Sequence, residues 1–270
     1  MSIVDNKERV GRFTSSKIHL LIPQGKVKMT KEELEVFKEF NPKSMVTTKP
    51  GGFITSGLTY IKEKQLEKRM GASLDTNSYS QSTAWGLACE TVIFSHLGLN
   101  YKMQSQETFL HPNEDLSKYW GGSVDLTVPD VKVAEIKCYQ RKNFGFYADC
   151  LMQKDIELFK SEFAQEYWQI VSNSIIHNVD IGEAILFAPF ESEMNDLREM
   201  IDETWETRFI FEKPNNELPC LPDGGYYPNI VMFEFEIPQE DKDYLTKRVE
   251  DAIELLKDDK YVKKAKKKTM

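Results

Sequence analysis

Residues 123–138 alternate between apolar and polar side chains on both sides of a Pro129-Asp130 turn sequence. This alternation predicts two short β-strands, because successive side chains of a strand point to opposite faces of a sheet. The expected apolar face of the first strand is Val124, Leu126 and Val128, opposite Ser123, Asp125 and Thr127. The second strand would place Lys132, Ala134, Ile136 and Cys138 on one face, opposite Val133, Glu135 and Lys137. Neighbouring strands lie about 4.8 Å apart, so we expect Asp125 beside Glu135, with Lys137 one pleat further along.

Helical spacing predicts a helix over residues 84–98 that ends at Gly98. Steps of three and four residues place on one face of this helix Leu87, Glu90, Phe94 and Leu97. Glu90 therefore interrupts an apolar face, where a lone buried carboxylate is costly unless it is paired or coordinates a metal. The alternative is that Glu90 lies at the edge of the face and reaches solvent or a lysine.

The other patterns predict a mixed α/β chain. The expected helices cover residues 14–22, 30–40, 60–70, 151–174 and 238–256, with a loop at 141–145. Pro23 would end the first helix, and a capping box from Thr30 to Glu33 would begin the second. Strands are expected at residues 184–188 and 230–237, and the later part of the second alternates with exposed glutamates.

Composition places the chain among globular α/β proteins. At 270 residues with 40% hydrophobic content, it can bury one sizeable core. It has no apolar run of the ~18 residues that a membrane span needs, and its N-terminus lacks a secretory apolar segment, so we expect a cytoplasmic protein. Four scattered cysteines without a C-x-x-C pair predict reduced thiols and argue against an iron-sulfur cluster. A net charge of −8 argues against nonspecific duplex binding by the whole surface, but not against a local basic channel.

The predicted Asp125–Glu135–Lys137 cluster has the residue types of a metal-dependent phosphodiesterase. Two adjacent carboxylates repel each other unless a cation neutralises them, and Mg²⁺ is usually held by one or two carboxylates plus substrate phosphate oxygens. The lysine could orient a water or stabilise charge on the phosphorane. The alternative is an ordinary hairpin with a solvated polar face, which is the common meaning of such spacing taken alone.

Further motifs occur in an order that resembles a known family. Arg9-Val10-Gly11-Arg12-Phe13-Thr14-Ser15-Ser16 resembles an R-x-G-x-x-T-x-S segment, and Ala84-Trp85-Gly86 followed by Glu90 resembles an A-W-G-x-x-x-E helix. Ser123-x-Asp125, Glu135-Ile136-Lys137-Cys138 and Tyr167-Trp168-Gln169 complete the series. In this order the motifs resemble the PD-(D/E)xK nucleases, and within them the phage lambda exonuclease and YqaJ-like viral recombination exonucleases.

The resemblance implies a restriction-endonuclease-like core, with a central mixed β-sheet flanked by helices. It implies Mg²⁺, or Mn²⁺ in its place, bound by Asp125, Glu135, the Ile136 carbonyl and Glu90. It also implies that Lys137 acts on the nucleophile and that Gln169 and Ser123 lie near the scissile phosphate. Arg9 and Ser16, in the segment that also holds Arg12, match positions that bind a terminal 5′ phosphate.

Two departures from the family pattern concern the backbone. Val124 and Leu126 flank the metal aspartate where the family has proline and glycine, and both suit a regular strand. The interval from Ser16 to Glu90 is also longer than in the phage lambda enzyme. We therefore expect one nuclease domain over residues 1–257 with a variable insertion at 43–83, followed by a basic, disordered tail at 258–270.

The function that the resemblance implies is 5′-to-3′ digestion of one strand of linear duplex DNA from 5′-phosphorylated ends, for recombination or repair. It further implies a homotrimer, a single-strand annealing protein as partner, and the cytoplasm of a bacterial host if the gene is of phage origin. An endonuclease on the same core, and an inactive nuclease-like protein that binds DNA, remain the alternatives.

Overall fold

The computed structural model describes residues 7–74, 80–104 and 107–257, so the predicted tail at 258–270 lies outside the described residues. A five-stranded mixed sheet forms the centre, in the order β10 (Ile230–Glu236), β9 (Ile181–Phe187), β8 (Lys132–Lys137), β7 (Leu126–Val128) and β4 (Lys102–Met103). Strands β8 and β9 run parallel, and the other neighbours run antiparallel. The predicted central mixed sheet is confirmed.

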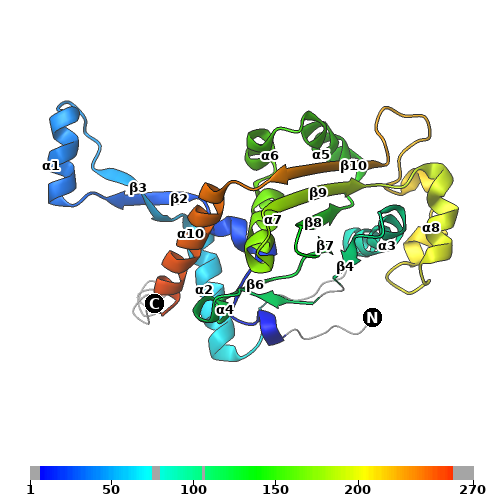
Figure 1. The fold of residues 1–270 in the computed structure, drawn as a ribbon, viewed down its shortest axis with the longest axis horizontal. Helices are drawn as coiled ribbons and strands as arrows, with labels where there is room; N and C mark the ends of the chain where they lie inside the picture. The colour runs from blue at the N-terminus through cyan, green and yellow to red at the C-terminus, as the bar shows by residue number, and fades with distance from the viewer. Residues whose placement is uncertain (1–6, 75–79, 105–106, 258–270) are drawn as a thin grey trace, which may run out of the picture.

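Helices cover both faces of this sheet (Figure 1). One face carries α5 (Arg141–Gln153), α6 (Ile156–Glu162), α7 (Ala164–His177) and α10 (Gln239–Lys257). The other carries α3 (Gln81–His96), α8 (Met194–Met200) and α9 (Arg208–Glu212). Each face has its own apolar cluster, and β8 serves both, because Val133 packs in the first and Ala134 and Ile136 in the second. The predicted alternation of this strand is therefore confirmed.

A smaller sheet adjoins the centre. It pairs β1 (Phe13–Thr14) in parallel with β6 (Trp120–Gly122), which pairs antiparallel with β5 (Phe109–Leu110). Around it lie the short helices η1 (Lys7–Arg9), η2 (Ser15–Leu21) and α4 (Glu114–Ser117), and the longer α2 (Thr55–Met70). The predicted helix at 14–22 is a 3-10 helix, with Thr14 making no side-chain cap. Two further 3-10 turns, η3 (Glu191–Glu193) and η4 (Asn215–Glu217), flank α8 and α9.

The predicted hairpin forms, but its first strand is shorter than expected. The Pro129-Asp130 turn closes through the Val131 N–H, which donates to the Val128 carbonyl at 3.0 Å, and Asp130 has a left-handed φ of 60°. Strand β7 begins only at Leu126. Val124 packs in the first apolar cluster and Leu126 in the second, so the prediction that they share one face is wrong. The chain bends between them, at Asp125.

Three helices replace the expected loop at 141–145 and single helix at 151–174. Phe144 and Tyr147 are both buried, and their packing continues α5 through the predicted loop. Lys154 takes a left-handed φ of 52° that ends α5, and the Asp155 carboxylate then accepts from the Leu158 N–H to cap α6. Phe163 separates α6 from α7. The long helix predicted from the apolar pattern is therefore wrong, because local caps divide it.

The buried face of α3 also differs from the expected one. Its buried residues are Ala84, Trp85, Ala88, Cys89, Val92 and Ile93, which pack on the sheet and α8. Phe94 is 36% exposed, so the predicted apolar face through Leu87, Glu90 and Phe94 is wrong. Glu90 lies at the edge of the buried face, half-buried.

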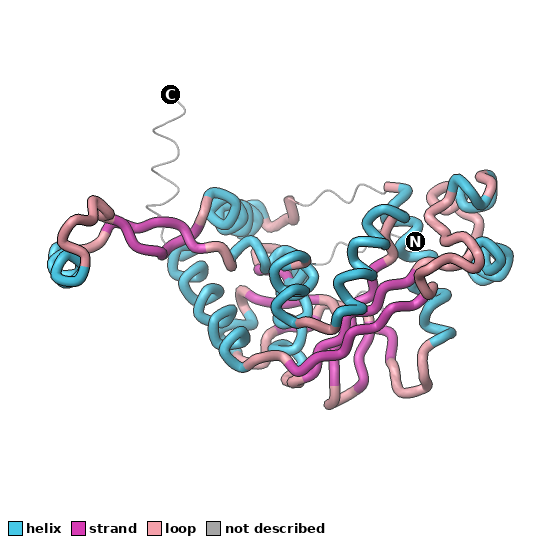
Figure 2. The backbone as a smooth tube through the Cα atoms, turned by 90° about the horizontal axis from the view of Figure 1, so that it is seen from above, coloured by secondary structure: helices cyan, strands magenta, loops and turns pink. Residues whose placement is uncertain are grey.

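An arm projects from the body in both views (Figures 1 and 2). It consists of β2 (Gln24–Lys28), α1 (Lys31–Phe40) and β3 (Thr48–Phe53), with β2 and β3 paired antiparallel. The Thr30–Glu33 capping box begins α1 as predicted. Within the expected insertion at 43–83, α2 buries Tyr60 and Ile61 in the core, so the projecting segment is 24–53.

Candidate active site

The carboxylates predicted to lie together do so at the bend before β7. Leu126 pairs with Ala134 across the hairpin, so the next pair in this register is Asp125 and Glu135. The Asp125 Oδ2 accepts a hydrogen bond from the Ile136 N–H at 2.8 Å. The backbone group of Ile136 that contacts this carboxylate is thus the amide, whereas the carbonyl was the predicted metal ligand.

Glu135 is the most enclosed charged residue of the site, with 1% of its surface exposed. Its two oxygens accept from different amides of α7: Gln169 Nε2 at 2.6 Å and Asn173 Nδ2 at 2.5 Å. Burial, and then the charge of Asp125, raise the pKa of Glu135 well above its ordinary range. Keeping Glu135 deprotonated in this position therefore has a high electrostatic cost in free energy.

Lys137 supplies the cation next to these carboxylates. Its Nζ lies 3.6 Å from Glu135 Oε2 and donates to Gln169 Oε1 at 3.4 Å. Burial alone would lower the pKa of Lys137, but Glu135 and Asp125 outweigh it and raise that pKa above its ordinary value. With these carboxylates ionised, Lys137 is protonated at neutral pH, the form that donates hydrogen bonds and offsets negative charge.

Glu90 adds a third carboxylate from α3. Burial, and then the charge of Asp125, raise the pKa of Glu90 to about 7, against an opposing effect of Lys137. The electrostatic neighbours of Glu90 are thus Asp125 and Lys137, two of the predicted site residues, and its place at the edge of the buried face agrees with the alternative expectation. Asp125, Glu135 and Glu90 surround one lysine, so the site carries excess negative charge when all three are ionised.

Sequence reasoning missed Asn173, whose side chain connects Glu135 of β8 with the backbone of Ser123. Besides Glu135, its Nδ2 donates to the Ser123 carbonyl at 3.0 Å. Asn173 follows Gln169 by one helical turn, so the two amides share a face of α7. This spacing, and the polar run Ser172-Asn173-Ser174 in an apolar helix, were the available signal.

The residues predicted to bind the terminal phosphate divide into two groups. Ser16 follows Ser15, whose hydroxyl lies 2.8 Å from that of Ser172 on α7, so this end of the segment borders the site. Arg12 instead turns towards α4, where its Nε donates to the Ser117 carbonyl at 2.8 Å. Arg9 lies in η1, half-buried, and its side chain donates no hydrogen bond within the described part of the chain.

The donor set fits a hydrated divalent cation. Within the described ranges, no three His, Cys, Asp or Glu side chains are grouped so that they could hold a metal ion together. Mg²⁺ does not need such a group, since it keeps several waters and takes one or two carboxylates plus phosphate oxygens. Burial, and then the charge of Asp125, raise the pKa of both Glu90 and Glu135, and a bound cation would neutralise the charge of these carboxylates.

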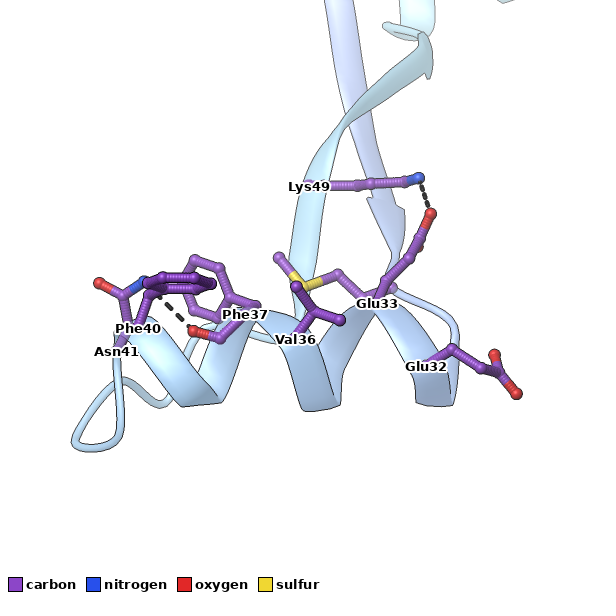
Figure 3. A pocket seen from close by; sticks show the side chains of 8 residues that line it. Glu32, Glu33, Val36, Phe37, Phe40, Asn41 and Lys49 are labelled. Atoms are coloured by element: carbon purple, nitrogen blue, oxygen red, sulfur yellow. Dashed lines mark hydrogen bonds and ion pairs between the residues drawn. The ribbon is translucent and has the colours of Figure 1, made fainter.

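A surface groove lies elsewhere, on the arm. It has a volume of about 550 Å³, and it is lined by Met29, Glu32, Glu33, Val36, Phe37, Phe40, Asn41 and Lys49 (Figure 3). Lys49 pairs with Glu33 at its edge. No residue of the candidate active site borders this groove, so its size has no bearing on the catalytic chemistry.

Known structures identify the class of fold. The sequence matches no protein-family model and no curated protein. The structure is similar to that of LHK-Exo, an alkaline exonuclease from Laribacter hongkongensis, with a TM-score of 0.55 and 13% identity over 97% of this chain and 96% of that one. The complex of LHK-Exo with dAMP gives a TM-score of 0.54 and 14% identity over 98% and 97%.

A phage-related exonuclease from Haemophilus somnus 129PT is also similar, with a TM-score of 0.50 and 14% identity over 96% of each chain. The chain therefore has the fold of alkaline and phage-related exonucleases along nearly its whole length. This likeness agrees with the resemblance that the motifs indicate.

Proposed function

We propose that this protein is a metal-dependent deoxyribonuclease, and specifically an exonuclease that degrades one strand of linear duplex DNA in the 5′-to-3′ direction. The observation that carries the proposal is the enclosed Glu135, with Asp125, Glu90 and protonated Lys137 around it, in an exonuclease fold. A protein that only binds DNA has no chemical need for this costly arrangement of charge.

Asp125, Glu135 and Glu90 would hold Mg²⁺, or Mn²⁺ in its place. When bound, the ion would polarise the phosphoryl oxygen and lower the pKa of a coordinated water. Gln169 and Asn173 fix the Glu135 carboxylate, and Lys137 would position the attacking water or offset charge that develops on the phosphate.

We favour an exonuclease over an endonuclease on the same core because of the Arg9–Ser16 segment. Arg9 offers a planar donor fork that makes no hydrogen bond to the described residues, and Ser16, next to Ser15 at the border of the site, adds a hydroxyl. We infer that this segment holds a terminal 5′ phosphate and so sets the polarity. Ser123, next to the site, would lie beside the scissile phosphate.

Assembly as a homotrimer, cooperation with a single-strand annealing protein, and a role in recombination or repair in the cytoplasm complete the proposal. The arm supports an assembly, because α1 buries none of its residues within the described chain while Phe40 is 79% and Met45 95% exposed. In the described part of the chain, no helix has the length and apolarity to cross a bilayer.

Digestion of three DNA substrates tests the proposal: linear duplex with 5′ phosphate, linear duplex with 5′ hydroxyl, and covalently closed circles, each with Mg²⁺ or EDTA. We expect Mg²⁺-dependent loss of the linear forms, fastest with 5′ phosphate, and intact circles. Cutting of closed circles would favour the endonuclease, and no cutting of any substrate would refute the nuclease.

A further inference from the structure

Two lysines contact one tyrosine ring, with an arginine near one of them, at the ends of β1 and β6 opposite to those that border the candidate active site. Lys68 of α2 lies with its Nζ 3.6 Å from the centroid of the Tyr119 ring, and Lys257 of α10 lies 5.1 Å from the same centroid. Arg12 is close enough to Lys68 to affect its charge state. We call Arg12, Lys68 and Lys257, with Tyr119, the cation cluster.

Within the described residues, no carboxylate pairs with these three side chains. Two acids close in sequence to Lys68 and Tyr119 are engaged elsewhere: Glu67 accepts from Lys64 and the Gly11 N–H, and Asp115 pairs with Lys118. Arg12 donates to two backbone carbonyls, those of Glu8 and Ser117, which leaves its charge uncompensated.

The chain holds this charge in place with close packing. A Cβ added at Gly11 would lie 2.2 Å from Lys68 Cγ, so the absence of a side chain there lets the lysine stem pass. Burial, Arg12 and Lys257 together lower the pKa of Lys68 to about 8. Lys68 and Lys257 nevertheless reach solvent, so an anion has access to both.

The smaller sheet connects the cation cluster to the candidate active site. Strands β1 and β6 are parallel, with Phe13 opposite Trp120. Arg12 and Tyr119 directly precede these strands, and Ser15 and Ser123 directly follow them. At about 3.3 Å per residue, the four steps from Tyr119 to Ser123 span roughly 13 Å. Phosphates of one DNA strand rise by roughly 3.4 Å each along the axis and also wind around it, so this span corresponds to a few nucleotides at most.

We propose that the cation cluster binds a backbone phosphate of the DNA substrate, within a few nucleotides of the phosphate at the candidate active site. Arg12 supplies a planar donor fork, and the two lysines supply point charges on the same anion. The inference rests on the proposed function, and it gives Arg12 a backbone phosphate as its ligand, in place of the terminal phosphate expected from its motif.

The test is equilibrium binding of a labelled 5′-hydroxyl duplex to the full chain in EDTA, measured by fluorescence anisotropy over a series of salt concentrations. Using this substrate without a metal separates the cation cluster from the terminal-phosphate segment and from cleavage. Lys68→Gln and Lys257→Gln should each weaken binding and make the slope of log K against log salt shallower by about 0.9, and the double variant by about twice that. Lys68→Arg should retain the wild-type slope.

Lys247→Gln is the matched control, because it removes one charge from the same helix as Lys257 at a site paired with Asp251. The inference would be overturned if the Lys68 and Lys257 variants gave the same slope as the control. It would also be overturned if inorganic phosphate bound at Lys68 without reducing the binding of DNA. Wild-type protein that binds no DNA would instead refute the proposed function. Thermal melting by circular dichroism checks that each variant is folded.

Discussion

Replacing Glu90 by glutamine should change how the stability of the metal-free protein depends on pH. Burial, and then the charge of Asp125, raise the pKa of Glu90 from its ordinary 4.5 to about 7 in the folded chain. One pKa unit corresponds to about 1.4 kcal/mol, so holding Glu90 ionised in the fold costs about 3 kcal/mol.

The direction follows from proton uptake. Between pH 4.5 and 7 the folded protein keeps a proton on Glu90 that the unfolded chain has released, so the free energy of unfolding falls as pH rises through this window. Glu135, whose pKa is also raised by burial and by Asp125, adds to the fall. Glutamine has no proton to release, so Glu90→Gln should remove about 3 kcal/mol of this decline.

Urea denaturation in EDTA at pH 5, 6, 7 and 8 measures the effect. We expect wild-type stability to fall across the series and the fall to be smaller in Glu90→Gln, while Glu254→Gln, at an exposed position of α10, follows the wild type. Adding Mg²⁺ at pH 7 should restore to the wild-type protein the stability that it lost as the pH rose, because the cation neutralises the carboxylates. Identical pH profiles for wild type and Glu90→Gln would refute the electrostatic account.

Three further substitutions test separate parts of the structure. Lys137→Ala should abolish cleavage of duplex DNA yet leave binding to DNA ends largely intact, and unchanged cleavage would remove Lys137 from the mechanism. Asn173→Ala removes the donor to Glu135 Oε1 and to the Ser123 carbonyl, so it should lower the free energy of unfolding by about 1–3 kcal/mol and slow cleavage, measured by urea denaturation and turnover. Phe40→Ser should lower the sedimentation coefficient with turnover per active site retained, and a value equal to that of wild type would argue that the arm makes no contact between copies.

Local patterns predicted those elements whose signals lie within a few residues. The Thr30–Glu33 capping box begins α1, and the alternation before Pro238 gives β10 with Phe233 and Phe235 buried. The last helix buries Leu245 as expected. In each case one strong periodic or capping signal determines the element, and no distant residue competes with it.

Tertiary packing decided what the sequence could not predict. Contact with the sheet and α8 determines which face of α3 is buried. Small residues such as Ala88 and Cys89 pack there, whereas Phe94 does not. The bend at Asp125 places Val124 and Leu126 in different cores, which simple alternation cannot anticipate.

The candidate site was predictable in its carboxylates and lysine, because their order along the chain matches a motif. Asn173 was not, since its role depends on how α7 crosses β8 and not on any motif of its own. The orientation of Arg12, towards α4 and not towards the site, likewise depends on contacts with α2 and α4, which lie far away in sequence.

The most direct test of the central claim compares wild type with Glu135→Gln on linear duplex DNA bearing 5′ phosphates, with Mg²⁺ and with EDTA. Glutamine keeps the size of the side chain but removes the charge that Gln169, Asn173 and Lys137 surround. The account predicts rapid release of nucleotides by the wild type with Mg²⁺ only, and none by the variant in either condition. Cleavage by Glu135→Gln at the wild-type rate, or by the wild type in EDTA, would contradict it.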